Sequence, residues 1–292
     1  MIRIDGRETA KQIKTEVAEE VARLKERGVK TPHLAVILVG NDGASHSYVN
    51  GKINDCKEVG FNSTLITLDD SVSEEQLLNE VEALNSDSDV DGFIVQLPLP
   101  KHIDGQRVLE AIDPNKDVDG FHPTNYGRMA LGMDAFLPAT PMGVMELLKR
   151  YDVETSGKHC VVVGRSHIVG APMGILMSQN NTPGNATVTI AHSRTQNLES
   201  LLSTADILIV GIGKPGFIKS SMLKEGVVVI DVGTTRVPST ETKSGFRLKG
   251  DVDFEDVKSK ASAMTPVPGG VGPMTRAALL LNTLKAVKRI KS

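Results

Sequence analysis

The 292-residue chain carries 33 Lys and Arg against 36 Asp and Glu, a formal net charge of −3, and 40% of its residues are hydrophobic. These proportions are typical of a globular protein and exclude a disordered or fibrous one, and the length predicts two domains or one large one. The mild acidity disfavours non-specific nucleic-acid binding, which depends on clustered Lys and Arg, and three Tyr with no Trp leave little for base stacking.

The sequence also bears on the cellular environment. Its first eight residues, MIRIDGRE, are charged and hold no apolar stretch of signal-peptide length. The longest apolar runs are strand-sized, far below the roughly 20 residues that cross a bilayer. Cys56 and Cys160 fit neither a CxxC nor a zinc-binding spacing. We therefore expect a cytoplasmic protein with reduced thiols, no membrane association and no metal site.

The first hundred residues alternate between helical and strand patterns. Apolar residues spaced by four, four and three predict an amphipathic helix over residues 8–27, which ends before a glycine. The elements expected next are a strand at 33–39, a helix at 44–59, a strand at 61–68, a helix at 73–84 with a Ser73/Gln76 capping box, and a strand at 92–97. This alternation predicts an α/β fold with a mainly parallel sheet.

Residues 113–141 break the alternation, because four prolines and several glycines there favour a linker or a long functional loop. A helix at about 142–151 then introduces a second α/β unit. Its expected elements are strand 159–163, helix 170–180, strand 186–190, helix 196–203, strand 206–210 and strand 227–231. A rigid loop rich in glycine and proline over 265–273 precedes a final helix at 274–290.

The segment 159–174 is the strongest candidate for a phosphate-binding loop. A buried strand runs into the turn Gly164-Arg165-Ser166 and then a helix, whose free N–H groups and dipole favour a pyrophosphate. The pattern is not GxGxxG, so a plain tight strand-to-helix connection explains the loop equally well. The next strand ends without a carboxylate for the ribose, and Arg165, Ser193 and Arg194 suit a 2′-phosphate, which predicts NADP over NAD unless Arg194 is only a solvated surface charge.

A candidate reaction centre comes from the first half of the chain. Tyr48 and Lys52 are four residues apart on a predicted helix and share a face, although such a pair is often surface decoration. Gln96 lies in an apolar strand, where it should bond a neighbour or face a pocket at the carboxyl end of the strand. Asp119 belongs to a short acidic turn that could also be a plain Asx turn.

Six segments in series resemble the bifunctional methylenetetrahydrofolate dehydrogenase/methenyltetrahydrofolate cyclohydrolase family. They are YVNGK at 48–52, GFIVQLPLP at 92–100, KDVDG at 116–120, PATP at 138–141, GRS at 164–166 with VGAP at 169–172, and PVPGGVGPMT at 266–275. The resemblance runs from about residue 2 to 288. It implies two α/β domains with a folate-binding cleft between them: a catalytic domain of residues 1–139 and 270–292, and an inserted Rossmann-type NADP-binding domain of residues 140–269.

The resemblance also implies an activity and a homodimer. Members oxidise 5,10-methylenetetrahydrofolate with NADP and hydrolyse the methenyl product to 10-formyltetrahydrofolate. By similarity Lys52 is the acid and base of hydrolysis, Gln96 holds and tunes it, Tyr48 lines the folate site and Asp119 bonds the pterin ring. The other implied folate contacts are Leu97, Pro98, Pro268, Gly269 and Gly270. The implied cofactor contacts are Gly164, Arg165, Ser166, Ser193, Arg194 and Thr234, the last replacing an isoleucine common in the family.

Two alternatives stay open: a dehydrogenase without the hydrolase step, and a non-catalytic nucleotide-binding protein. The intact set of Tyr48, Lys52, Gln96 and Asp119 argues against the first. A free lysine, with a pKa of about 10.4, is a poor base unless burial or a cationic neighbour lowers that pKa, and the cationic methenyl product is one such neighbour. His167 and His192 lack a catalytic constellation, so we expect structural roles for them in their loops.

Overall fold

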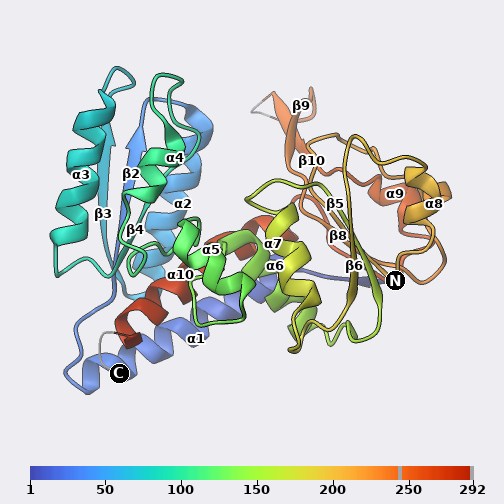
Figure 1. Ribbon diagram of the computed structural model, residues 1–292, viewed down its shortest axis with the longest axis horizontal. Helices are drawn as coiled ribbons and strands as arrows, with labels where there is room; N and C mark the ends of the chain where they lie inside the picture. The colour runs from blue at the N-terminus through green and yellow to red at the C-terminus, as the bar shows by residue number, and fades with distance from the viewer. Residues whose placement is uncertain (243–244, 290–292) are drawn as a thin grey trace. The chain divides into compact units, whose positions relative to one another are not determined.

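A computed structural model describes residues 1–242 and 245–289 of the chain (Figure 1). Contacts divide the chain into two compact units, which we name by their largest sheets. The six-stranded unit comprises Met1–Ala10 and Thr140–Thr275, and the three-stranded unit comprises Lys11–Ala139 and Arg276–Ser292. This division differs at residues 1–10 and 270–275 from the expected domain boundaries, and the assignment of a function to each domain stays a prediction.

The three-stranded unit has a parallel sheet in the order β3 (Asn62–Leu68), β2 (His33–Val39), β4 (Gly92–Val95). Every residue of β2 is buried, as its continuous apolar run predicts. Helices α3 (Glu74–Ser86) and α4 (Gly105–Glu110) cover one face of this sheet, and α2 (Gly43–Val59) lies along the other (Figure 1). The division between the units falls within α1 (Gly6–Glu26) and α10 (Val271–Arg289).

The six-stranded unit is likewise built on a parallel sheet with helices on its faces. Its strands are all parallel and follow the order β1 (Ile2–Arg3), β11 (Ala263–Met264), β8 (Val228–Asp231), β7 (Ile207–Val210), β5 (His159–Val163), β6 (Thr187–Ala191). Helix α7 (Gly170–Ser178) packs against β5 and β6, while α8 (Leu198–Leu202) and α9 (Phe254–Val257) join the core on the other face. The unit also holds α6 (Ala139–Arg150), η1 (Ser220–Met222) and the antiparallel pair β9 (Thr235–Pro238) and β10 (Phe246–Lys249). The expectation of an α/β fold with mainly parallel sheets is confirmed.

The expected loop at 113–141 is wrong in its middle, where α5 (Pro123–Ala130) forms. The side chain of His122 accepts the N–H of Thr124 at the start of this helix, and Pro123 occupies its first turn, where a missing N–H does no harm. Both signals are local, but a helix of eight residues is too short for its few apolar residues, Tyr126, Met129 and Ala130, to stand out among the surrounding prolines and glycines. The short elements β1, β11, α9 and the β9–β10 pair were not expected either.

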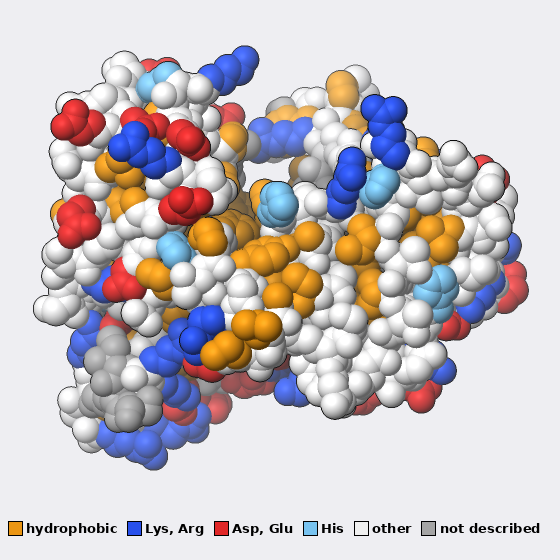
Figure 2. Space-filling view, viewed as in Figure 1, with side chains coloured by type: hydrophobic (Ala, Val, Ile, Leu, Met, Phe, Trp, Pro, Cys, Tyr) orange, Lys and Arg blue, Asp and Glu red, His pale blue; other side chains and the backbone are white. Residues whose placement is uncertain are grey.

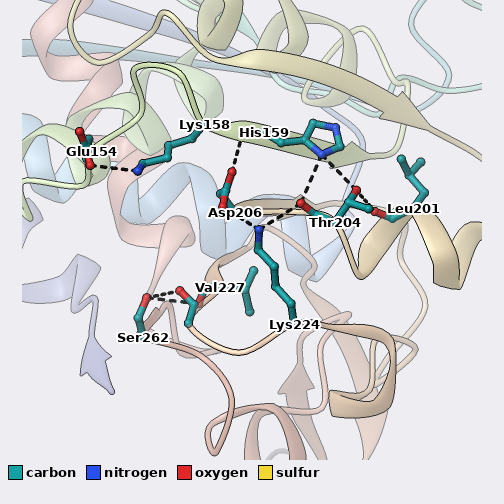
Figure 3. A network of polar contacts seen from close by, with 10 residues as sticks. Glu154, Lys158, His159, Leu201, Thr204, Asp206, Lys224, Val227 and Ser262 are labelled. Carbon is teal, nitrogen blue, oxygen red and sulfur yellow. Dashed lines mark hydrogen bonds and ion pairs between the residues drawn. The ribbon is translucent and has the colours of Figure 1, made fainter.

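Polar contacts brace the amino ends of both sheets. In the six-stranded unit the N–H of His159 donates to Asp206 over 2.8 Å, and Lys224 binds the same carboxylate over 2.7 Å (Figure 3). The ring of His159 reaches Thr189 on β6 at 2.9 Å. The carboxylate of Asp206 thus ties the first residue of β5 to the residue that precedes the neighbouring strand β7.

The three-stranded unit repeats this arrangement. The N–H of His33, the first residue of β2, donates to Asp91 over 2.8 Å, and Lys30 lies 2.9 Å from the same carboxylate. The ring of His33 reaches Thr64 on β3 at 2.9 Å. Since Asp91 directly precedes β4, each sheet joins the first residue of one strand to the residue before a neighbouring strand with the same three residue types, His, Asp and Lys.

Charged side chains of both signs lie on the surface (Figure 2), and both cysteines are buried. In the face drawn in Figure 2, acidic and basic side chains both occur on each unit. None of the helices in the described ranges combines the length and the apolar character that a membrane span requires. Cys56 and Cys160 are buried free thiols. Among the described residues, no group of three or more His, Cys, Asp or Glu could hold a metal ion.

Candidate active site

Lys52 is buried at the centre of the candidate site in the three-stranded unit. It lies on α2, one turn after Tyr48, and is only 5% exposed. Its Nζ lies 3.0 Å from Oε1 of Gln96 and 4.9 Å from the centre of the Tyr48 ring. Tyr48 is 37% exposed, so its ring lies between the buried amine and solvent-accessible surface. A buried amine with two specific neighbours is not surface decoration.

Gln96 uses both ends of its amide. It follows the last residue of β4, and its Nε2 donates to the carbonyl of Leu97 over 2.6 Å. Because a carbonyl can only accept and an ammonium can only donate, this bond turns Oε1 toward Lys52. Of the two possibilities that the sequence left open, the structure shows that Gln96 bonds a neighbour, and that neighbour is Lys52.

The two carboxylates of the acidic turn, Asp117 and Asp119, have different surroundings. Asp117 is buried and accepts the N–H groups of Gly120, Phe121 and His122 at 3.1, 3.2 and 2.8 Å. The Asx-turn interpretation therefore belongs to Asp117. The carboxylate of Asp119 accepts no hydrogen bond within residues 1–242 and 245–289, and it interacts electrostatically with Lys52. Its predicted bond to the pterin ring stays a prediction.

Electrostatics keep the amine of Lys52 easy to deprotonate. Burial lowers the pKa of Lys52, the negative charge of Asp119 raises it, and the positive charge of Arg276 lowers it again. Burial also raises the pKa of Asp119, against the opposing effect of Lys52. A lysine with a lowered pKa presents a neutral amine more often near neutral pH, which a general base requires.

A second set of residues, not predicted from the sequence, lies next to Lys52 along α2. Arg276 on α10 lies 3.1 Å from Asp55, and a Cβ added at Gly51 would lie only 2.1 Å from its Nη1. Asp55 is 6% exposed. A glycine in the middle of a helix, directly before the candidate lysine, was the only local signal for this arrangement.

The candidate nucleotide loop lies at the carboxyl end of β5 in the six-stranded unit. Strand β5 lies between β6 and β7, so the loop opens where the sheet reverses its winding direction, the usual place for a dinucleotide. Gly164 has a φ of 126°, which favours glycine. An added Cβ at Gly170 would lie 2.1 Å from the carbonyl oxygen of Gly164, and one at Gly174 would lie 2.7 Å from the Ile190 side chain. Three glycines thus provide the turn and the close approaches, at a spacing other than GxGxxG.

Arg165 and Ser166 lie in this loop, Ser193 and Arg194 lie in the turn after the adjacent strand β6, and Thr234 follows β8. Val163 pairs with Ala191, so the turns that carry Arg165 and Arg194 leave adjacent strands at the same edge. Arg165, Ser166, Ser193, Arg194 and Thr234 are exposed. The hydroxyl of Ser166 accepts the N–H of Val169 over 3.2 Å just before α7. His192 accepts the N–H of Arg194 at its Nδ1 over 3.1 Å, a contact within the loop of the kind expected for a structural role.

The predicted folate contacts fall in both units. Leu97 and Pro98 follow Gln96 directly in the three-stranded unit. Pro268, Gly269 and Gly270 precede α10 in the six-stranded unit, where Gly269 has a φ of 107°. An added Cβ at Gly6 would lie 1.8 Å from the carbonyl oxygen of Gly270, so this loop lies directly on the start of α1. Contact of these residues with folate stays a prediction.

Comparison with known proteins agrees with this geometry. The family model "Tetrahydrofolate dehydrogenase/cyclohydrolase, catalytic domain" matches residues 4–119, and the companion "NAD(P)-binding domain" model matches residues 138–291. The Bifunctional protein FolD of Flavobacterium johnsoniae is 60% identical over 285 residues, which cover 98% of this chain and 97% of that relative.

Two solved structures are similar over nearly their whole length. The bifunctional FolD enzyme of Campylobacter jejuni gives a TM-score of 0.93 at 45% identity and covers 99% of each chain. The methylenetetrahydrofolate dehydrogenase-cyclohydrolase of Trypanosoma brucei, complexed with NADP cofactor and inhibitor, gives a TM-score of 0.94 at 39% identity, over 100% of this chain and 98% of that one.

The parallel sheets, the glycine turn after β5 and the buried lysine centre define an α/β enzyme class in which one part binds a nicotinamide dinucleotide and another is catalytic. Within that class, the chain belongs to the tetrahydrofolate dehydrogenase/cyclohydrolase family.

Proposed function

We propose that the protein is a bifunctional folate enzyme of one-carbon metabolism. It oxidises 5,10-methylenetetrahydrofolate to 5,10-methenyltetrahydrofolate with NADP and hydrolyses the product to 10-formyltetrahydrofolate. The observation that carries this proposal is the buried amine of Lys52, bonded to Gln96 and facing Asp119, in a chain similar to bifunctional relatives over 98% of its length.

In the hydrolytic step, we assign to Lys52 the transfer of protons to and from the attacking water. Its neutral amine accepts a proton from water as the new C–O bond forms, and the resulting ammonium can return that proton when a C–N bond breaks. Gln96 fixes the position of the amine, because the bond to Leu97 fixes Gln96 itself. The carboxylate of Asp119 is available to an N–H of the pterin, and the ring of Tyr48 offers a flat surface to the substrate.

The nucleotide loop fits NADP. The close approach of Gly170 to Gly164 leaves no space for a Cβ, as the backbone of a phosphate-binding turn requires. Exposed Arg165 and Arg194, in the turns after adjacent strands, are suited to hold a 2′-phosphate, and Ser193, directly before Arg194, adds a hydroxyl donor. When bound, NADP accepts the hydride from the methylene carbon of the folate.

Other features of the proposal rest on the family resemblance. The catalytic domain comprises residues 1–139 and 270–292, the NADP-binding domain comprises residues 140–269, and the enzyme is a homodimer. Leu97 and Pro98 contact folate beside Gln96. A cytoplasmic location is supported by the two cysteines, which are buried free thiols suited to a reducing compartment.

An absorbance assay on the purified protein tests both proposed activities, oxidation and hydrolysis. With methylenetetrahydrofolate and NADP, we expect absorbance from the methenyl product followed by its breakdown, and weaker use of NAD. Oxidation without breakdown would identify a dehydrogenase alone, and NADP binding without any absorbance change would identify a non-catalytic protein. Equal or better use of NAD would contradict the cofactor assignment.

The variant Lys52→Met tests the assigned base. It should abolish methenyltetrahydrofolate hydrolysis while the fold and NADP binding persist, because methionine fills a similar volume without an amine. Lys57→Met is the matched control, since Lys57 is an exposed lysine on the same helix. Hydrolysis by Lys52→Met at the rate of the unmodified protein would remove Lys52 from the mechanism.

A further inference from the structure

A second cation lies against the helix that carries Lys52. The guanidinium of Arg276 lies over the backbone of Gly51, the residue directly before Lys52, because a Cβ there would be 2.1 Å from Nη1 and 3.2 Å from the central guanidinium carbon. Only glycine leaves this space. Glycine destabilises a helix interior relative to alanine, so the position of Arg276 gives a reason for Gly51 in the middle of α2.

Asp55 holds this cation in place. Its carboxylate lies 3.1 Å from Nε of Arg276 and 3.3 Å from Nζ of Lys14, and its side chain is nearly buried. The Arg276 side chain remains one-third exposed. An ion pair with Asp55 alone could also form with the guanidinium in solvent. Here the carboxylate of Asp55 and the space left by the absent Cβ of Gly51 together fix the guanidinium against the backbone of α2.

We propose that Arg276 is a positioning residue for Lys52: seated on Gly51 and held by Asp55, it fixes a positive charge against the turn of α2 that carries the lysine. This inference rests on the proposed function for its consequence in hydrolysis. Its physical content, a cation that acts on Lys52, can be measured without any substrate.

The surroundings of Lys52 explain why such a cation is useful. Asp119 faces the amine from the acidic turn and, by itself, stabilises the charged ammonium. Cys56 on α2 acts weakly in the same direction, while Gln96 and the ring of Tyr48 carry no net charge. Arg276 from α10 is the group that opposes Asp119 among the described residues with a resolved effect on Lys52. The site can therefore keep an acidic pterin-binding group without fixing the base as an ammonium.

The test is a titration of Lys52 followed by NMR of protein labelled with ¹³C in its lysine side chains, with Lys52→Met used to assign the signal. Arg276→Gln removes the charge but keeps an N–H donor for Asp55, and it should raise the titration midpoint by about one pH unit, a roughly tenfold loss of neutral amine below the midpoint. Arg276→Lys should restore the midpoint. Arg289→Leu, which removes a cation from the far end of α10, should leave it unchanged.

Asp55→Asn provides an independent arm in case Arg276→Gln does not fold. Asparagine keeps an Oδ1 acceptor for Nε of Arg276, so the cation stays in place, while the neutralising negative charge is lost and the midpoint should fall. A purely structural role predicts that both variants impair the protein without opposite shifts. Unchanged midpoints in either variant, or shifts in the same direction, would overturn the proposal.

The hydrolysis assay then connects the charge to function. In Arg276→Gln, the rate at neutral pH should fall about tenfold and recover at high pH, because the neutral amine forms again above the raised midpoint. A loss of rate that is equal at every pH would overturn the inference. If the unmodified protein hydrolyses no methenyltetrahydrofolate, the proposed function fails, while the NMR midpoints still decide the effect of Arg276 on Lys52.

Discussion

The close approach of α7 to the nucleotide loop makes Gly170→Ala a sharp test of the cofactor site. The added methyl group would lie 2.1 Å from the carbonyl oxygen of Gly164 and 2.7 Å from the N–H nitrogen of Arg165. Both atoms belong to the backbone, so no side-chain rotation relieves the clash. To reach even 3.0 Å from that oxygen, the helix or the loop must move by about 0.9 Å.

This displacement has a stability and a binding consequence. Overpacking costs about 1 to 3 kcal/mol, and alanine regains little of it through helix propensity because Gly170 is the first residue of α7. A loss of about 2 kcal/mol corresponds to a fall in Tm of about 5 °C for the six-stranded unit. Hydrogen bonds from the loop to a phosphate weaken when lengthened by about 0.9 Å, so the Kd for NADP should rise about tenfold or more.

Gly174→Ala is the matched control, on the same helix and with the same substitution. Its methyl group would meet only the tip of the Ile190 side chain, at 2.7 Å, and Ile190 is 41% exposed and free to rotate away. Calorimetric titration with NADP and thermal unfolding should therefore separate the two variants. If Gly170→Ala binds NADP normally, or if Gly174→Ala loses as much, the argument that backbone contact shapes the loop is wrong.

Two further predictions concern the three-stranded unit. Gln96→Ala should impair hydrolysis at every pH because Lys52 loses the acceptor that lies 3.0 Å from its amine. Gln96→Glu should instead shift the pH–rate profile of hydrolysis to higher pH, because a carboxylate stabilises the charged ammonium. Normal turnover in both variants would show that Gln96 is only a packed amide. Burial raises the pKa of Asp117 to about 6, above its value in the unfolded chain, so its contribution to stability is fully present below about pH 4 and is lost as the pH rises through about 6. Denaturant unfolding between pH 4 and 7 should show this decline in the unmodified protein and a flatter profile in Asp117→Asn.

Much of the fold could be predicted because its signals are local. The side chain of Asp42 caps the start of α2, Gly60 ends it in a left-handed conformation, and the capping box of Ser73 and Gln76 forms as expected. The two-residue strands β1 and β11 could not be predicted in this way. They exist only because β8 supplies a partner for β11, which in turn pairs with β1.

The candidate site shows the same limit. The pairing of Tyr48 with Lys52 follows from a four-residue spacing, and the position of Gln96 at the end of a buried strand follows from its apolar neighbours. The contact of Arg276 with Asp55 joins α10 to α2, and nothing in either helix alone points to the other. Charge partners that come from distant segments need the tertiary structure to reveal them.

The braces at the amino ends of the two sheets have a consequence for the opposite ends. Strand β4 is only four residues long: Asp91 anchors its beginning to His33, and Gln96 follows its end. Strand β5 is anchored through His159 and leads into Gly164. Because each strand is short and anchored at its first residue, it cannot shift along its own axis. The residues that follow its last residue therefore keep a fixed position relative to the sheet. Removing the carboxylate, for example by Asp91→Ala, would then displace the amide of Gln96, although the two residues lie at opposite ends of β4.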